Sequence, residues 1–170
     1  MTAPGRVFDD PAELAAAAGL PLGSSGFVDV DQERIDRFAD VTGDRAWIHV
    51  DTRRARTGPF GGTVAHGFLA LSLLTALLDE IFRVDGTDFV INRGLDKVRF
   101  MTPVRAGDRV RAEAVLTSAT ERPHGYTEAV VTVKLHVESE PVPALSAQQR
   151  LLFRRTEPFR DTEPFRRTET

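Results

Sequence analysis

Apolar and polar positions recur with two different periods along this chain, and the change falls near residue 82. From His66 to about Phe82, apolar residues occur on all sides of a helical projection, which predicts a helix enclosed on most sides. After it, apolar residues recur at nearly every second position over residues 89–100, 109–120, 126–139 and 144–153. Long strands after one enclosed helix predict an α+β domain in which an antiparallel sheet wraps around that helix.

Capping signals predict shorter elements before the enclosed helix. Residues 11–18 are rich in alanine, which is typical of a short helix, and residues 27–30 read as a short strand. Asp31 is a good N-cap for a helix that ends at Gly43, because glycine is favoured where the chain leaves a helix. Asp51 is expected to cap one further short turn of helix.

The length of 170 residues is enough to bury one core, so we expect a single main domain. An N-terminal helix and loop are expected over residues 1–25, the main domain over 26–154, and a tail over 155–170. In the tail, the sequence Thr-Glu-Pro-Phe-Arg at 156–160 recurs six residues later. A charged repeat with a proline in each unit cannot bury a core, so disorder is expected there.

Composition excludes several classes of function. The formal net charge of −3 and the lack of a basic block argue against a nucleic-acid partner. The chain has no cysteine, so it has neither a disulfide nor a thiolate nucleophile, which fits a reducing compartment. The run from 66 to 82 is too short and too polar at its ends for a membrane span, and no signal peptide is apparent. We therefore expect a cytoplasmic protein without a membrane partner.

The segment Thr42-Gly43-Asp44-Arg45-Ala46-Trp47-Ile48-His49 carries the main candidate chemistry. It places an acid, Asp44, and a base, His49, five residues apart, just after the end of a predicted helix. Ala65-His66-Gly67 then opens the enclosed helix, whose first backbone N–H groups have no partner within the helix. An acid, a base and a helix N-terminus this close in sequence point to an enzyme that acts on an acyl carbonyl compound.

Other chemistries have weaker support in the sequence. There is no Gly-x-Ser-x-Gly elbow and no Gly-x-Gly-x-x-Gly segment after a strand, so neither a serine hydrolase nor a nucleotide cofactor is indicated. His49 and Asp51 could in principle ligate a metal, but no third ligand has a persuasive spacing. We expect no cofactor and no metal ion.

From about Gly26 to Arg154 the chain resembles the MaoC-like dehydratases, which include the R-specific enoyl-CoA hydratases and the nodulation protein N-like group. The first block of the family motif is matched by Phe38, Thr42-Gly43-Asp44, Ile48, His49 and Ala55. Two further blocks agree, at residues 62–67 and at residues 94–100 before Pro103-Val104. Ala46 and Trp47 stand where Asn-Pro is usual in the family. Three ordered blocks at the expected separations make the resemblance specific.

The resemblance implies a single hot-dog domain, with the sheet as the bun and helix 66–82 as the sausage, and pairing into a homodimer. It implies that Asp44 and His49 catalyse addition of water across a trans-2-enoyl thioester of CoA or an acyl carrier, giving the (R)-3-hydroxyacyl product, or the reverse. It further implies that the backbone N–H of Gly67 is the oxyanion donor. His66 and Ser72 are expected at the same substrate-binding site.

These residue types suit the chemistry that the resemblance implies. Hydration needs a base to take a proton from water as it attacks Cβ, and an acid to deliver one to Cα. Two groups on either side of one water can do both, and histidine can act in either role near neutral pH. The sequence does not decide whether Asp44 or His49 starts as the base. A preorganised N–H donor for the developing oxyanion is worth about 3 kcal/mol.

Four of the site residues have a structural alternative, and the function has two. Asp44 could be a turn residue after Gly43, and His49 could be a core histidine with its hydrogen bonds satisfied. His66 could simply close the N-terminus of the helix, and Ser72 could hydrogen-bond to the helix backbone. The chain could be a non-catalytic accessory subunit that binds acyl thioesters or a partner. It could also be a thioesterase, since hot-dog folds support that reaction as well.

Overall fold

The computed structural model describes residues 5–156, which form five helices and eight strands. The helices are α1 (Glu13–Ala16), α2 (Gln32–Thr42), α3 (Trp47–Val50), α4 (Thr52–Ala55) and α5 (Gly67–Ile81). The strands are β1 (Arg6–Phe8), β2 (Pro21–Ser24), β3 (Val28–Val30), β4 (Phe82–Val84), β5 (Thr87–Phe100), β6 (Asp108–Arg122), β7 (Tyr126–Val137) and β8 (Leu145–Arg155). The predicted tail lies outside the described residues from position 157 onward.

Six of the strands form one antiparallel sheet with α5 packed on it. The order is β2-β6-β7-β8-β5, and β3 pairs with β6 farther along the same edge as β2. The strands β1 and β4 form a separate parallel pair. Because β5 pairs only with β8 among the described strands, its other edge is free.

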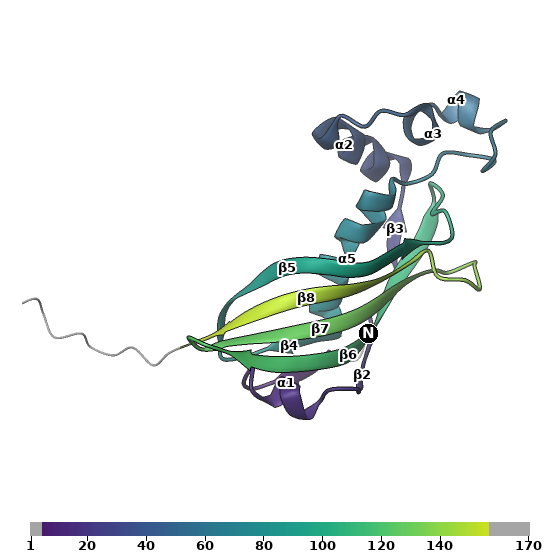
Figure 1. Ribbon diagram of the computed structural model, residues 1–170. Coiled ribbons are helices and arrows are strands. Elements are labelled where there is room, and N and C mark those ends of the chain that lie inside the picture. Colours follow the sequence, from purple (N-terminus) through teal and green to yellow (C-terminus); the bar gives the residue numbers. More distant parts are fainter. Residues whose placement is uncertain (1–4, 157–170) are drawn as a thin grey trace, which may run out of the picture.

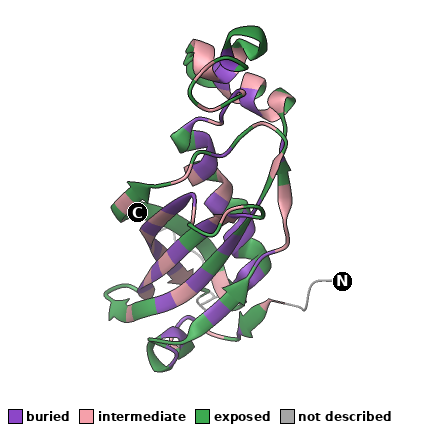
Figure 2. Cartoon of the chain, turned by 90° about the vertical axis from the view of Figure 1, so that its right-hand side faces the viewer, coloured by how far each residue is buried: buried purple, intermediate pink, exposed green. Residues whose placement is uncertain are grey.

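The core lies between α5 and the inward side of the sheet. Alternate residues of β6 and β7 are almost completely buried, as the period of two predicts. They are Val110, Ala112, Ala114 and Leu116 on β6, and Ala129, Val131, Val133, Leu135 and Val137 on β7. From α5, Leu74, Leu77, Leu78 and Ile81 complete this core. The banding of buried and exposed positions along the strands is visible in Figure 2.

The three short helices α2, α3 and α4 gather at one end of the molecule, beyond the end of the sheet (Figure 1). The central helix α5 starts near them and runs back along the sheet. Its N-terminus therefore lies between the sheet and the segment that carries Asp44 and His49.

The long elements expected from the sequence are confirmed, including the α+β hot-dog arrangement. The caps Asp31 and Asp51 both accept a backbone hydrogen bond, and Gly43 has a φ of 79° at the end of α2. The elements β1, β2, β4 and α3 were not expected from the sequence. One side of α5 is also more open than its sequence suggests. Phe68 is 71% exposed, and Ser72 and Thr75 are exposed on the same helix.

No helix within residues 5–156 is long and apolar enough to cross a membrane.

The outer face of the sheet carries a charged cluster around Glu128 on β7. Glu128 is 5% exposed. Its carboxylate accepts hydrogen bonds from Arg93, Arg122 and Arg150, which lie on three different strands. The pKa of Glu128 is held below its ordinary value of 4.5. The hydrogen bond from Arg122 is the largest cause, and the hydrogen bond from Arg150 acts in the same direction. The cluster joins β5, β6, β7 and β8 on the side away from α5.

We expect Glu128→Gln to lower the free energy of unfolding at neutral pH by about 1–2 kcal/mol, because charged hydrogen bonds to half-exposed arginines are lost. Since the folded-state pKa of Glu128 is depressed, its contribution is present above the unfolded pKa and is lost as the pH falls through the folded pKa. Urea unfolding of both proteins at pH 7 and in mild acid measures this. The difference in the free energy of unfolding between wild type and Glu128→Gln should become smaller in acid. Substitution of an exposed neighbouring residue, Glu121→Gln, should have little effect on this free energy at either pH.

Candidate active site

Asp44 lies in the loop that follows the C-terminus of α2. Gly43, in the left-handed region, donates its N–H to the carbonyl of Ala39 at 2.8 Å and stops the helix. The Thr42 hydroxyl donates to the carbonyl of Phe38 at 2.7 Å and fixes the last turn. Asp44 follows directly, and its Oδ1 accepts the N–H of Ala46 at 3.3 Å. The carboxylate therefore remains exposed and is held by the loop.

His49 lies on α3 with its ring buried. The residue is 8% exposed, and its Nδ1 lies 2.6 Å from the carbonyl oxygen of Val64. A carbonyl can only accept, so Nδ1 carries the proton, and in the neutral ring Nε2 is left with its lone pair. The contact with Val64 therefore fixes the tautomer of the neutral His49 ring and leaves the lone pair on Nε2.

His66 is the N-cap residue of α5 and lies against His49. The two imidazole rings stack with centroids 3.7 Å apart and an interplanar angle of 25°. The Nε2 of His66 is 2.8 Å from the backbone carbonyl oxygen of Asp44 and therefore donates to it. Its Nδ1 is buried and has no hydrogen-bond partner among the residues the structure describes. His66 thus joins the N-terminus of α5 to the segment that carries Asp44.

The fold brings Asp44, His49 and His66 together as one group. One ligand atom of each lies within 4.8 Å of the others. The two nitrogens that stay free are His49 Nε2 and His66 Nδ1, so this set could hold a metal ion as well as a water. Asp51, which the sequence raised as a ligand beside His49, instead uses its carboxylate to cap α4 at the N–H of Arg54, 2.9 Å away.

Gln32 supports the group of Asp44, His49 and His66 through hydrogen bonds, and the sequence did not identify it as a site residue. Its Nε2 donates to the backbone carbonyl of His49 at 2.8 Å and to Asp36, and its Oε1 accepts the hydroxyl of Thr63. One side chain thus connects the start of α2 with α3 and with the segment that holds Val64. Nothing in local spacing signals this role, because the partners lie 17 and 31 residues away.

Trp47 stands at the first position of α3, where the family motif has proline, and Ala46 stands in place of its asparagine. Ala46 offers no side-chain cap, as its residue type dictates. The Trp47 ring is instead held by the guanidinium of Arg54, whose central carbon is 4.2 Å from the ring centroid, and it packs against Gly58. A side chain at Gly58 would meet the ring at 3.1 Å. The turn that presents His49 is therefore fixed by packing.

Gly67 is the first residue of α5, and the structure shows no acceptor for its N–H among residues 5–156. It borders a cavity of about 210 Å³ with Ala65, Ala70 and Phe100. Ser72 lies one turn farther on, where its hydroxyl donates to the carbonyl of Leu69 at 2.8 Å. It borders a different cavity on the open side of α5. Gly67 is thus at the same helix end as His66, while Ser72 is separate from the Asp44–His49–His66 group.

Comparison with known proteins agrees with this fold. The model of the MaoC-like domain family matches residues 12–140. The 3-hydroxyacyl-thioester dehydratase Z of Mycobacterium tuberculosis is 46% identical over 143 residues, which is 84% of this chain and 95% of the relative. Nodulation protein N of Rhizobium leguminosarum bv. viciae is 43% identical over 138 residues, 80% of this chain and 86% of the relative.

Among solved structures, the monoamine oxidase regulatory protein from Archaeoglobus fulgius shares the fold with a TM-score of 0.73 and 22% identity. The match covers 89% of this chain and 98% of that one. The architecture is that of a hot-dog domain. The chain belongs to the MaoC-like domain family.

Proposed function

We propose that this protein is a hydratase or dehydratase that interconverts trans-2-enoyl and (R)-3-hydroxyacyl thioesters of CoA or an acyl carrier. The observation that carries the proposal is that Asp44, His49 and His66 each bring one ligand atom within 4.8 Å of the others, beside the N-terminus of α5. A relative that is 46% identical is named a 3-hydroxyacyl-thioester dehydratase, which supports the same reaction class.

In the proposed reaction, one water lies between Asp44 and His49. The Nδ1–H of His49 is engaged with Val64, so Nε2 accepts a proton from the water as its oxygen bonds to Cβ. The Asp44 carboxylate accepts the other hydrogen of the water and orients it. The proton taken from the water reaches Cα through the dyad, so the net result is addition of H and OH across the double bond. Dehydration follows the same steps in reverse.

Charge develops on the thioester oxygen as Cβ is attacked, and the start of α5 can stabilise it. The free N–H of Gly67 lies at the positive end of a helix of 15 residues. A preorganised donor of this kind typically contributes roughly 10²–10³-fold to the rate. The absence of a side chain at Gly67 leaves room for the ring of Phe100, from which an added Cβ would be only 3.1 Å away.

We assign His66 a positioning role. Its Nε2–H holds the backbone carbonyl of Asp44, and its ring supports that of His49 by stacking. A neutral His66 ring can carry that hydrogen bond without placing a second positive charge beside His49 when His49 is protonated. This contact sets the distance between the acid and the base.

A chain-length series of trans-2-enoyl-CoA substrates tests the proposal with the wild-type protein. We expect loss of the enoyl absorbance with at least one chain length, no release of free thiol, and no change in rate when a chelator is added. Thiol release would identify a thioesterase. No loss of absorbance at any chain length would indicate a non-catalytic acyl-thioester-binding subunit, and loss of activity with the chelator would point to a metal at Asp44, His49 and His66.

We further propose a homodimer that forms through the free edge of β5. Several large apolar side chains of this strand are between 37% and 51% exposed, namely Phe89, Val90, Ile91, Leu95 and Phe100. An unpaired edge that carries such side chains is suited to pairing with the same strand of a second copy. Light scattering of the purified protein measures its mass directly.

A further inference from the structure

Gln149 is an exception within the buried face of β8. The strand alternates strictly, and the residues on its α5 side are Leu145, Ala147, Gln149, Leu151 and Phe153. Gln149 is 2% exposed, yet its Oε1 has no hydrogen-bond partner among the residues the structure describes. A buried amide oxygen without a partner is unfavourable for folding, and native proteins rarely keep one without a reason.

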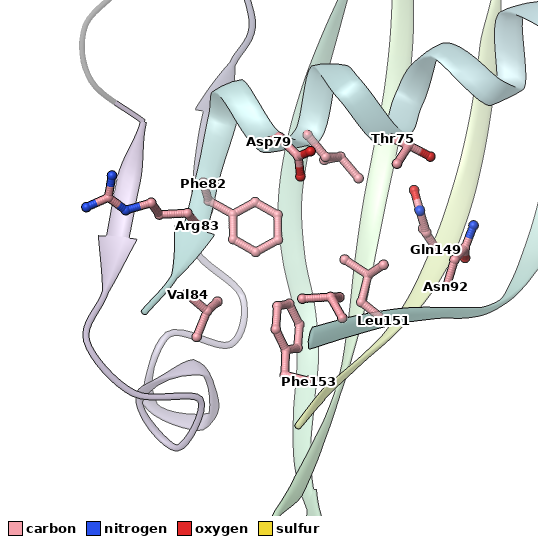
Figure 3. A pocket seen from close by; sticks show the side chains of 11 residues that line it. Thr75, Asp79, Phe82, Arg83, Val84, Asn92, Gln149, Leu151 and Phe153 are labelled. Atoms are coloured by element: carbon pink, nitrogen blue, oxygen red, sulfur yellow. The ribbon is translucent and has the colours of Figure 1, made fainter. Parts of the chain in front are cut away.

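The side chain of Gln149 borders a cavity beside α5. It measures about 580 Å³, a volume typical of small-molecule sites, and lies between the second half of α5 and the strands β4, β5 and β8. Figure 3 shows Phe82, Val84, Leu151 and Phe153 gathered on one side and Thr75, Asn92 and Gln149 on the other, with the charged residues Asp79 and Arg83 near Phe82. Apolar rings and aliphatic side chains thus form one side of the cavity, with two charged groups beside Phe82.

A second cavity connects this region with the start of α5. It measures about 230 Å³, includes Phe68 and Ser72, and shares Thr75, Asn92 and Gln149 with the large cavity. Phe68 is the residue after Gly67, and its ring lies 6.4 Å from that of Phe100, which borders the cavity at Gly67. From Gly67 to Thr75 the helix rises about 12 Å. This distance is within the reach of an acyl chain of medium length that begins at Gly67.

We propose that these two cavities receive the distal part of an acyl chain that carries a hydroxyl group, and that Gln149 binds this hydroxyl. A hydroxyl both donates and accepts, so it satisfies the unpartnered amide in either orientation of its oxygen and nitrogen. Beyond it, the apolar part of the cavity holds further carbons. The inference rests on the proposed function, because it assumes that the thioester lies at Gly67.

A plain alkyl chain is the poorer ligand for this cavity. It would close the cavity to water and leave the amide oxygen of Gln149 without a partner, a penalty that the hydroxyl removes. Short acyl chains do not reach Gln149, so the preference applies only to chains long enough to pass Thr75.

The test compares two substrates in wild type and two variants. The substrates are trans-2-decenoyl-CoA and its ω-hydroxy derivative, and the variants are Gln149→Leu and Gln148→Leu. Gln148 is the matched control, since it is the same residue type on the opposite face of β8 and donates to the Thr132 hydroxyl. We expect wild type and Gln148→Leu to prefer the ω-hydroxy substrate about tenfold in kcat/KM, and Gln149→Leu to lose this preference by gaining activity on the plain chain.

A gain on the plain chain cannot come from misfolding, so it identifies the role of Gln149. Equal preference in all three proteins would overturn the inference while leaving crotonyl-CoA hydration, and hence the proposed function, intact. The inference would also be overturned if Gln149→Leu changed the oligomeric mass but not the preference for the ω-hydroxy substrate. That result would make the cavity an interface between copies. If no enoyl substrate reacts, calorimetry with decanoyl-CoA and ω-hydroxydecanoyl-CoA tests the same preference in binding, independently of the reaction.

Discussion

Asp44→Asn and His49→Ala are each expected to lower the rate of enoyl-CoA hydration by about 10²–10⁴-fold, the usual cost of removing a positioned acid or base. The Asp44→Asn substitution keeps the size of the side chain and its contact with the N–H of Ala46, but it removes the carboxylate that orients water. The His49→Ala substitution removes the lone pair of Nε2 that Val64 prepares for the proton. Steady-state rates with crotonyl-CoA measure both effects.

Two matched substitutions control for general damage. Asp88→Asn changes an exposed carboxylate on β5, and His124→Asn changes an exposed imidazole in the turn between β6 and β7, at a φ of 62° that asparagine tolerates. Both should retain the wild-type rate, and thermal melting should show all four variants folded. Rates of Asp44→Asn and His49→Ala within about threefold of wild type would remove these residues from the chemistry.

The pair Gly67→Pro and Gly67→Ala isolates the backbone N–H of Gly67. Proline is favoured at the first position of a helix, and the preceding His66 has φ −60° and ψ 140°, a conformation that accepts a following proline. Proline therefore removes the N–H with little effect on the helix. We expect kcat for Gly67→Pro to fall roughly 10²–10³-fold relative to Gly67→Ala.

Alanine is the necessary reference, because any Cβ at this position would meet the Phe100 ring at 3.1 Å. That contact affects both variants alike, and only proline lacks the hydrogen-bond donor. If Gly67→Ala and Gly67→Pro have the same kcat, the oxyanion is not stabilised by this N–H. An effect confined to KM would assign Gly67 to substrate binding alone.

The sequence predicted the elements that position the site because their signals are local. The cap at Asp31, the stop at Gly43 and the apolar run after His66 each depend on a few neighbouring residues. They place Asp44 and His49 at the end of one helix and Gly67 at the start of another. The motif resemblance then suggested that these two ends meet.

The contacts that orient the group could not be predicted, because they join residues that are distant in sequence. The tautomer of His49 depends on a backbone carbonyl 15 residues away in the sequence. The tautomer of His66 depends on a backbone carbonyl 22 residues away. Gln32 looks like any polar residue in the first turn of a helix. The same holds for Gln149. Its alternation with apolar neighbours marks an inward position, but it does not show that the amide oxygen lacks a partner among the described residues.

The most direct test of the proposed function is the reaction of the wild-type protein with the two enantiomers of 3-hydroxybutyryl-CoA. We predict that the R enantiomer yields crotonyl-CoA, that the S enantiomer does not react, and that Asp44→Asn reduces the R reaction at least about 10²-fold. No formation of crotonyl-CoA from the R enantiomer, an equal reaction with the S enantiomer, or release of free CoA would contradict it.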